Sequence, residues 1–356
     1  MKIINNNRTN IYAFLSIIIL CLTSCQTINK AENINLKTFE KFQQEGSPSF
    51  TNLFEFTNGV PNIIHSIDTT LIISLGKGGI NDAFFYNYSL PNKTLSKGYL
   101  KGGRGPEEAL TVFSSGIIGN ILWSYDITLG RITTIDKEKA LKQEKNINIK
   151  QYSKNVFSYQ IAFKDLNTIL AVGNRQSKYK IQEIDLKSEK IIAEYGEFDN
   201  ISEAISFESF KSANECFILT KPSGKKAVIS YRYKDEIEIF NTESHKSIAI
   251  IKGPEAFEAD LDLSANVAYR NKNTRFAFFN GDTTEKFIYL LYSGNSHESE
   301  FRDFCNTVYV YDWEGNPVRK IKLNKYVTSL SVAKDDSALY AYDPYSGQIV
   351  QAQIQF

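Results

Sequence analysis

The 356-residue sequence is poor in the residues from which many active sites are built. It has three histidines: His65, His245 and His297. His245 falls in a predicted hairpin turn and His65 just before a predicted strand, so both are expected to be incidental. A Ser-His-Asp triad or a three-histidine metal site would need these few histidines to fall in favourable positions by chance. The sequence therefore predicts neither.

The sequence also lacks a long run of charge of one sign. Its 41 basic residues are balanced by 40 acidic residues. Binding to nucleic acid usually needs a clustered basic face, so no nucleic-acid partner is predicted. No helical apolar period of any length is present either. The 24 Phe and 20 Tyr residues, with abundant Ile and Thr, instead favour an all-β protein.

The apolar run over residues 11–22 is short of the roughly 20 residues that span a bilayer comfortably. This run follows an N-terminal segment that carries the basic residues Lys2 and Arg8, and it ends at Leu22-Thr23-Ser24-Cys25. That tetrapeptide resembles the bacterial lipobox, whose cysteine is acylated. The alternative is an ordinary secretory signal or a short membrane anchor with a chance cysteine.

These features predict a lipoprotein signal peptide over residues 1–24. A lipidated Cys25 and a flexible polar tether would follow over residues 25–48. Several acyl chains on one cysteine would hold the protein stably at a membrane. We therefore expect a location in the bacterial cell envelope, with the outer membrane as the preferred membrane and the periplasmic or surface face left open.

Cys216 and Cys305 are the two cysteines beyond the signal and the lipidation site. An oxidising envelope would permit a disulfide between them. The favoured alternative is that both are buried thiols that behave as small apolar side chains. No paired histidines accompany them, so a zinc site is not predicted.

Internal repeats dominate the rest of the sequence. Residues 121–132 and 338–349 align without a gap, each as a strand, a turn with Asp and Gly, and a second strand. Hairpins of this kind recur at the spacing of four-stranded propeller blades. Their first strands begin near residues 84, 131, 179, 236, 308 and 348.

The last of these hairpins has room for only one long strand before the chain ends. Ser49–Phe56 alternates polar and apolar residues, so it is expected to supply the missing outer strand. Pairing the two ends of the chain would close the ring and cover an otherwise bare edge. The predicted fold of residues 49–356 is therefore a six-bladed β-propeller of four-stranded antiparallel blades, closed by an N-terminal strand in the last blade.

Three segments carry a resemblance to a known family: residues 102–108, 287–294 and 308–318. They resemble the TolB-like six-bladed β-propeller lipoproteins of bacterial envelopes, and the similarity covers most of residues 50–356. One departure is Glu107-Glu108-Ala109, where the family pattern has Gly-Glu-Phe. The resemblance implies the fold and an envelope location. It supplies no catalytic residues.

Two groups of polar residues are candidates for binding a ligand or partner. Arg104 and Glu107 lie in a glycine-rich segment that favours a sharp turn between blades over a phosphate-binding loop, and they are placed at the mouth of the ring. The second group lies in the insertion over residues 294–306, where functional residues often concentrate, although a plain solvated loop is the alternative. Its members are His297, Glu298, Glu300, Arg302 and Asp303.

The sequence thus predicts a membrane-anchored binding or scaffold propeller whose partner is a peptide, a glycan or an envelope protein. No catalytic residue is assigned and no cofactor is predicted. The alternative is a calcium-dependent hydrolase or lactonase, which would need several oxygen ligands to converge on the central channel. A third possibility is a structural subunit of an envelope complex, which would have no pocket but an exposed apolar patch.

Overall fold

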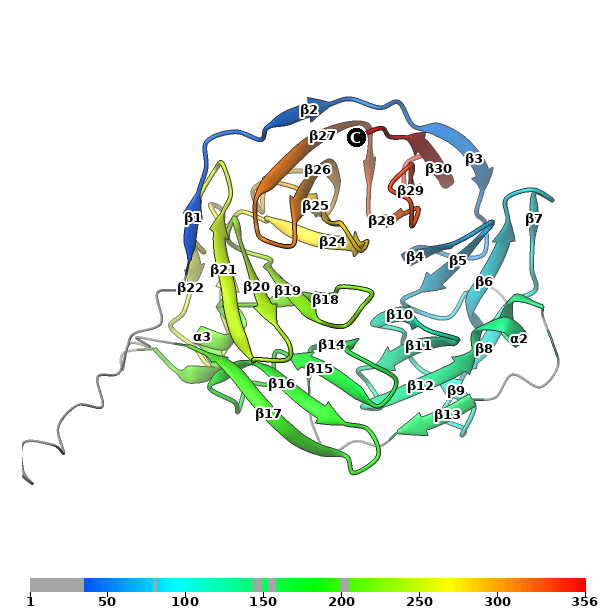
Figure 1. Ribbon diagram of the computed structural model, residues 1–356, viewed down its shortest axis with the longest axis horizontal. Helices are drawn as coiled ribbons and strands as arrows, with labels where there is room; N and C mark the ends of the chain where they lie inside the picture. Colours follow the sequence, from blue (N-terminus) through cyan, green and yellow to red (C-terminus); the bar gives the residue numbers. More distant parts are fainter. Residues whose placement is uncertain (1–34, 80–81, 143, 145–148, 153–157, 199–204) are drawn as a thin grey trace, which may run out of the picture. The chain divides into compact units, whose positions relative to one another are not determined.

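The computed structural model describes residues 35–79, 82–142, 144, 149–152, 158–198 and 205–356. Cys25 and the expected signal peptide over 1–24 lie outside these ranges. Six of the β-sheets formed by the described residues are arranged as the blades of a propeller around a common centre (Figure 1). The prediction of an all-β, six-bladed propeller is therefore confirmed.

The first three blades follow one another along the chain, each running from an innermost to an outermost strand. Blade one consists of β4 (Pro61–Ile67), β5 (Thr70–Leu75), β6 (Ala83–Ser89) and the short edge strands β7 (Thr94–Leu95), β8 (Tyr99–Gly102) and β9 (Glu108–Ala109). Blade two consists of β10 (Ser114–Ile118), β11 (Ile121–Asp126), β12 (Arg131–Asp136) and β13 (Ile149–Tyr152). Blade three consists of β14 (Gln160–Phe163), β15 (Thr168–Val172), β16 (Tyr179–Asp185) and β17 (Lys190–Glu197).

The remaining blades have the same order, and the last one joins the two ends of the described chain. Blade four consists of β18 (Cys216–Thr220), β19 (Lys226–Tyr231), β20 (Glu236–Asn241) and β21 (Lys246–Lys252). Blade five consists of β24 (Phe278–Thr283), β25 (Phe287–Tyr292), β26 (Cys305–Asp312) and β27 (Pro317–Val327). Blade six consists of β28 (Ser329–Val332), β29 (Ala338–Asp343), β30 (Gln348–Gln353) and β3 (Thr51–Glu55).

The connections between blades contain little regular structure. The helix α2 (Lys137–Leu141) follows β12, and α3 (Phe207–Ala213) precedes β18. A small hairpin of β22 (Leu261–Asp262) and β23 (Tyr269–Arg270) precedes β24. Within the described ranges, no helix is both long and apolar enough to cross a bilayer.

Apolar packing between neighbouring blades holds the ring together. Alternate residues of a strand face opposite sides of its sheet, so an inner strand covered by a blade on each side is apolar at successive positions. Leu71, Ile72 and Ile73 of β5 are all fully buried for this reason. The core accordingly divides into six apolar clusters, one at each joint between adjacent blades.

The N-terminal part of the described chain runs along the outside of three blades (Figure 1). The strand β1 (Leu36–Thr38) pairs in parallel with β21, and β2 (Gln44–Gly46) pairs in parallel with β27. The next strand, β3, pairs antiparallel with β30. We call residues 35–55 the strap. Between β1 and β2, Phe42 is buried against Tyr309 and Tyr311 of blade five.

The strap differs from the flexible tether expected over residues 25–48. Residues 35–48 are polar in composition, but β1 and β2 are held by backbone pairing, which does not depend on apolar side chains. Phe42 then anchors the segment between them. The expectation of a tether can therefore hold only for residues before the strap, which lie outside the described ranges.

Cys216 and Cys305 are both free and buried. The structure thus favours the interpretation as buried thiols over a disulfide. Burial raises the pKa of the Cys216 thiol to about 12 and also raises the pKa of Cys305. Neither thiol has the solvent exposure that a reactive cysteine needs.

Candidate functional site

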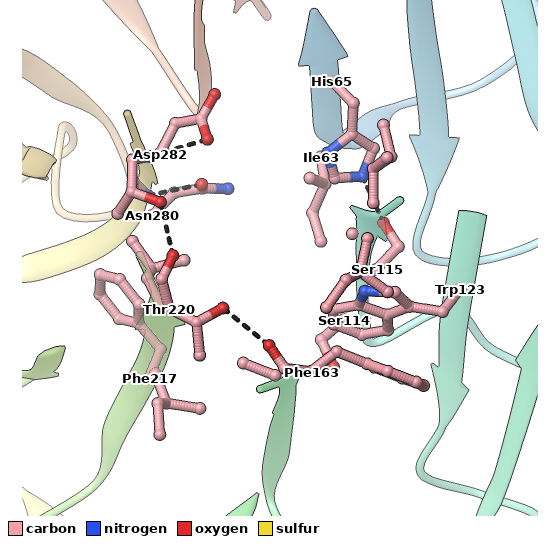
Figure 2. Close-up of a pocket in the computed structure, with 18 of the residues that line it drawn as sticks. Ile63, His65, Ser114, Ser115, Trp123, Phe163, Phe217, Thr220, Asn280 and Asp282 are labelled. Carbon is pink, nitrogen blue, oxygen red and sulfur yellow. Dashed lines mark hydrogen bonds between the residues drawn. The ribbon is translucent and has the colours of Figure 1, made fainter. Parts of the chain in front are cut away.

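A cavity of about 620 Å³ lies at the centre of the propeller. Residues of the innermost strands β4, β10, β14, β18 and β24 line it, together with Val332 of β28. All six blades therefore contribute to one central channel. Figure 2 shows part of its lining, with Asp282 and Asn280 on one wall and His65 and Ser115 on the wall opposite.

One wall of the channel is aromatic. Trp123 belongs to the second strand of blade two, yet its indole passes over Gly116 of the innermost strand and reaches the cavity. A Cβ atom at Gly116 would lie 2.5 Å from Trp123 Cζ2, so only glycine leaves room for the ring here. The indole stacks on Phe163 of blade three, with ring centroids 5.1 Å apart.

Polar side chains on the inner strands link neighbouring blades across their joints. Thr220 of blade four donates from Oγ1 to the Phe163 carbonyl of blade three at 2.9 Å, and Thr283 of blade five donates to the Thr220 carbonyl at 2.8 Å. Blade six is tied to both of its neighbours, because Ser331 Oγ donates to Asp282 and accepts from the Ser66 amide.

The joints of blade two complete this set of links. Tyr125 donates from its hydroxyl to the Ser158 carbonyl next to blade three at 2.8 Å. His65 Nε2 and Ser115 Oγ lie 2.9 Å apart and connect blades one and two. Every joint of the ring therefore has a polar link beside its apolar cluster. Much of the polar lining of the channel is thus occupied in holding the blades together.

The pair of His65 and Ser115 has the spacing of a general base and its nucleophile. His65, expected just before a strand, lies within β4 and lines the cavity. Burial lowers the pKa of its imidazole to about 4, so the ring is neutral near pH 7. Among the described residues, however, no carboxylate bonds to its other ring nitrogen to orient it, as a triad requires. The geometry therefore favours a joint between blades over a catalytic pair.

Asp282 is a half-buried carboxylate of the channel. Its Oδ2 accepts from the Val332 amide at 2.9 Å and from Ser331 Oγ at 3.0 Å. Burial raises the pKa of Asp282 to about 6, and these hydrogen bonds oppose that rise. The carboxylate thus serves the joint between blades five and six and stays largely ionised above pH 6.

A cationic group lies at another part of the lining. Arg232 follows β19 and donates from Nε to Glu215 Oε1 at 2.5 Å. The Tyr159 hydroxyl donates to the same oxygen at 2.6 Å. The guanidinium lies over the ring of Phe279, 5.1 Å from its centroid. Tyr159, Arg232 and Phe279 all line the cavity, whereas Glu215 supports them from behind.

The channel was also the predicted location of calcium ligands in the alternative hydrolase. Within the described ranges, no group of three or more His, Cys, Asp or Glu side chains could hold a metal ion. Two amide side chains of the lining donate hydrogen bonds through Nδ2: Asn62 to the Val112 carbonyl, and Asn280 to the Asn62 carbonyl. The calcium-dependent hydrolase stays a hypothesis of the sequence.

Arg104 and Glu107, expected at the mouth of the ring, lie in an exposed turn between β8 and β9 and do not line the cavity. The turn is held by Glu108, which accepts from the Gly105 amide at 2.7 Å, and by Arg131, which donates to the Gly105 carbonyl at 2.8 Å. A side chain at Gly103 would collide with Glu108, and its φ of +150° also favours glycine. These contacts support the structural interpretation of the glycine-rich segment.

The insertion over residues 294–306 connects β25 and β26 of blade five, as the sequence predicts. Its candidate residues also lie outside the cavity lining. Glu298, Glu300, Arg302 and Asp303 are exposed, and Arg302 Nε lies 3.3 Å from Asp303 Oδ2. His297 is turned inward, with its backbone amide bound to the Thr274 carbonyl.

Aromatic residues that were not among the predicted candidates form a surface at this insertion, and two of them belong to it. Phe301 stacks on Tyr326 with centroids 4.4 Å apart, and Phe304 contacts Tyr345 at 5.3 Å. Tyr345 is 63% exposed. We call these four residues the aromatic surface. It lies on blades five and six, and it is distinct from the channel lining.

The residues that line the channel were missed because they come from inner strands of different blades. One signal was present: Gly116 precedes the hairpin predicted over residues 121–132 and pairs in register with its Trp123, and a glycine in a strand often marks a close approach. Nothing comparable in the sequence indicates that Tyr159, Glu215 and Arg232 meet.

Comparison with known proteins agrees with the architecture. A family model described as TolB-like 6-blade propeller-like matches residues 38–335. No curated protein sequence matches the chain. Among solved structures, the chain is similar to a candidate exported protein of Bacteroides fragilis at 12% identity and a TM-score of 0.53, over 90% of this chain and 100% of that one.

A second solved structure with similarity is the β-propeller domain of Cps50 (Swd1) from Myceliophteria thermophila. The identity is 10% and the TM-score 0.48, over 86% of this chain and 100% of that one. Similarity at this level carries no argument about function, and the similarity to the Bacteroides protein shows the fold alone. The family match over most of the chain is more specific: this protein belongs to the TolB-like six-bladed β-propeller family.

Proposed function

We propose that this protein is a lipid-anchored binding protein of the bacterial envelope that holds a small ligand in its central channel. The observation that carries the proposal is a cavity of about 620 Å³ to which all six blades contribute. A cavity of this size with aromatic walls and a few placed polar groups is typical of small-molecule sites. Trp123 and Phe163 offer the aromatic wall, and Arg232 offers a placed charge.

Native mass spectrometry of the protein extracted from its own membranes tests ligand binding. The wild-type protein is expected to retain a bound small molecule that Trp123→Ala loses. Tyr269→Ala is the matched control, because Tyr269 is an aromatic residue that is 58% exposed and does not line the cavity. Recovery of the wild-type protein without any bound molecule would count against a ligand in the channel.

The membrane anchor rests on the lipobox-like segment that ends at Cys25. Cys25→Ser removes the thiol that would be acylated. The variant is expected to lose incorporation of a labelled fatty acid and to leave the membrane fraction. Continued labelling of Cys25→Ser would contradict the lipid anchor. Fractionation of inner and outer membranes would test the preferred location.

The aromatic surface supports a second contact, with a peptide, glycan or envelope protein. Exposed tyrosine and phenylalanine rings with nearby charged groups are frequent at binding surfaces. Tyr345→Ser is expected to reduce recovery of a crosslinked partner from membranes. Tyr269→Ser, at an exposed tyrosine that is not part of the aromatic surface, is the matched control. Equal recovery with Tyr345→Ser and wild type would remove this surface from the proposal.

A further inference from the structure

Arg232 is held by the protein at one side of its guanidinium. Nε donates to Glu215, the Tyr159 hydroxyl fixes that carboxylate, and Phe279 supports the face of the guanidinium. The position of the cation is therefore determined before any ligand binds. Such a preorganised arginine loses little side-chain entropy when it forms further hydrogen bonds.

The other end of the same guanidinium is open. No described residue accepts a hydrogen bond from either Nη atom of Arg232, whose only such contact is through Nε. Arg232 nevertheless lines the cavity. The two Nη groups form a planar fork that matches two oxygens of a carboxylate, sulfonate or phosphate.

Arg232 differs in this respect from the other cationic side chains of the lining. Four cationic side chains line the cavity, against two carboxylates, Asp282 and Glu285. Each of the three lysines among them, Lys137, Lys221 and Lys334, lies within 4.0 Å of a carboxylate through its single ammonium group. Arg232 meets its carboxylate through Nε alone, so both of its Nη groups are left for an anion.

We propose that the channel binds a small organic anion, with its anionic group on the two Nη groups of Arg232 and its apolar body along Trp123 and Phe163. This inference rests on the proposed function and adds the chemical class of the ligand. Glu215 acts as a positioning residue, because it holds Arg232 from outside the cavity lining. Tyr159 in turn holds Glu215, through a hydrogen bond to the same carboxylate oxygen.

Two fluorescent probes with the same aromatic frame separate the role of charge from that of apolar contact. 8-Anilinonaphthalene-1-sulfonate carries a sulfonate, and N-phenyl-1-naphthylamine lacks it. Titration of the wild-type protein is expected to give one site for each probe, with tighter binding of the sulfonate. Arg232→Gln is expected to weaken binding of the sulfonate about tenfold, as for loss of a charge-assisted hydrogen bond, and to leave the neutral probe within about twofold.

Two further variants complete the experiment. Arg232→Lys keeps the charge beside Glu215 but loses the fork, so intermediate binding of the sulfonate is expected. Arg175→Gln removes an exposed arginine outside the cavity lining and should change the binding of neither probe. Unchanged binding of the neutral probe reports that each variant is folded with its channel intact.

The outcomes distinguish the two proposals. If neither probe binds the wild-type protein, ligand binding in the channel is contradicted. If both probes bind equally and Arg232→Gln changes neither affinity, the channel still binds ligands but the inference of an anion is overturned. Loss of both probes together in Arg232→Gln, with Arg232→Lys equal to wild type, would also overturn the role of the fork.

Discussion

Lys180 of blade three donates to Glu238 of blade four across their joint, with Nζ 2.7 Å from Oε2. The two side chains are 14% and 2% exposed. Two residues earlier, Lys178 makes an ion pair of the same length with Glu197. In this pair the side chain of Lys178 is 58% exposed and that of Glu197 is 49% exposed. The two pairs therefore have the same N–O distance but differ in burial.

Lys180→Ala is expected to destabilise the protein strongly, because it leaves the Glu238 carboxylate buried without its cation. The expected loss is about 3–5 kcal/mol in the free energy of unfolding, measured by urea denaturation. Lys178→Ala is the matched control and should cause a much smaller loss, because water replaces its partner. Equal losses in the two variants would show that burial is not the deciding factor.

Gly116→Ala should disturb the aromatic wall of the channel. The new methyl group would occupy space that the Trp123 indole now fills, so the ring must move toward the cavity. Overpacking of this kind costs about 1–3 kcal/mol. The emission of Trp123 is expected to change, whereas that of Trp313, buried in blade five, should not. Substitution of Trp313 by Phe isolates the Trp123 signal, and an unaltered spectrum would contradict the close approach.

The pH dependence of stability should reveal Asp282. Burial raises its pKa to about 6 from 3.8, so the folded state binds the proton more readily than the unfolded state. The contribution of Asp282 to stability is therefore largest at low pH and falls by about 2 kcal/mol as the pH rises from 4 to 6, because the carboxylate partly faces the cavity. Asp282→Asn should remove this pH dependence. The free energy of unfolding of the variant, relative to that of the wild type, should therefore increase as the pH rises from 4 to 6.

His65 should act in the opposite direction. Its pKa is lowered from 6.5 to about 4, so the unfolded state binds the proton more readily. The contribution of the neutral ring to the free energy of unfolding is fully present above pH 6.5 and is lost as the pH falls toward 4. We expect a loss of about 2 kcal/mol, because the ring partly faces the cavity. His65→Gln should abolish this loss. Urea denaturation at several pH values measures both variants, and slopes of the same sign would contradict these assignments.

Phe42 should control the stability of the strap independently of the ring. Phe42→Ala removes its packing on Tyr309 and Tyr311. We expect amide exchange over residues 36–46 to accelerate by about two orders of magnitude, which corresponds to about 3 kcal/mol. Leu36→Ala is the control, because Leu36 is 59% exposed. Acceleration in the inner strands as well would mean that the strap and the ring unfold together.

The fold was predictable because its signals are local. Each hairpin in the outer half of a blade carries its own turn chemistry, as where Asp312 accepts from the amides of Glu314 and Asn316 and Gly315 has a φ of +79°. These features act over a few residues, so they are visible in the sequence. The first strand of each of the six predicted hairpins is consequently the third strand of a blade.

The channel was less predictable because it is assembled from residues far apart in the chain. Tyr159 and Glu215 are separated by 56 residues and meet only when blades three and four pack. The charged residues of the 294–306 insertion were predicted to bind a partner because they are concentrated in a long loop. They lie outside the cavity lining. The strap was missed for a related reason, because backbone pairing of β1 and β2 leaves almost no pattern in their side chains.

The position of β3 has a consequence for the order of folding. Thr51 of β3 donates a hydrogen bond to the carbonyl of Gln351 in β30, and the two residues are 300 positions apart. These two neighbouring strands of blade six are the first and the last of its four strands in the order of the chain. During synthesis β3 is therefore made about 300 residues before its neighbour β30. Closing so long a loop is entropically costly and slow, so we expect blade six to assemble after the others. Until that step, β3 would have an unpaired edge that other chains can join.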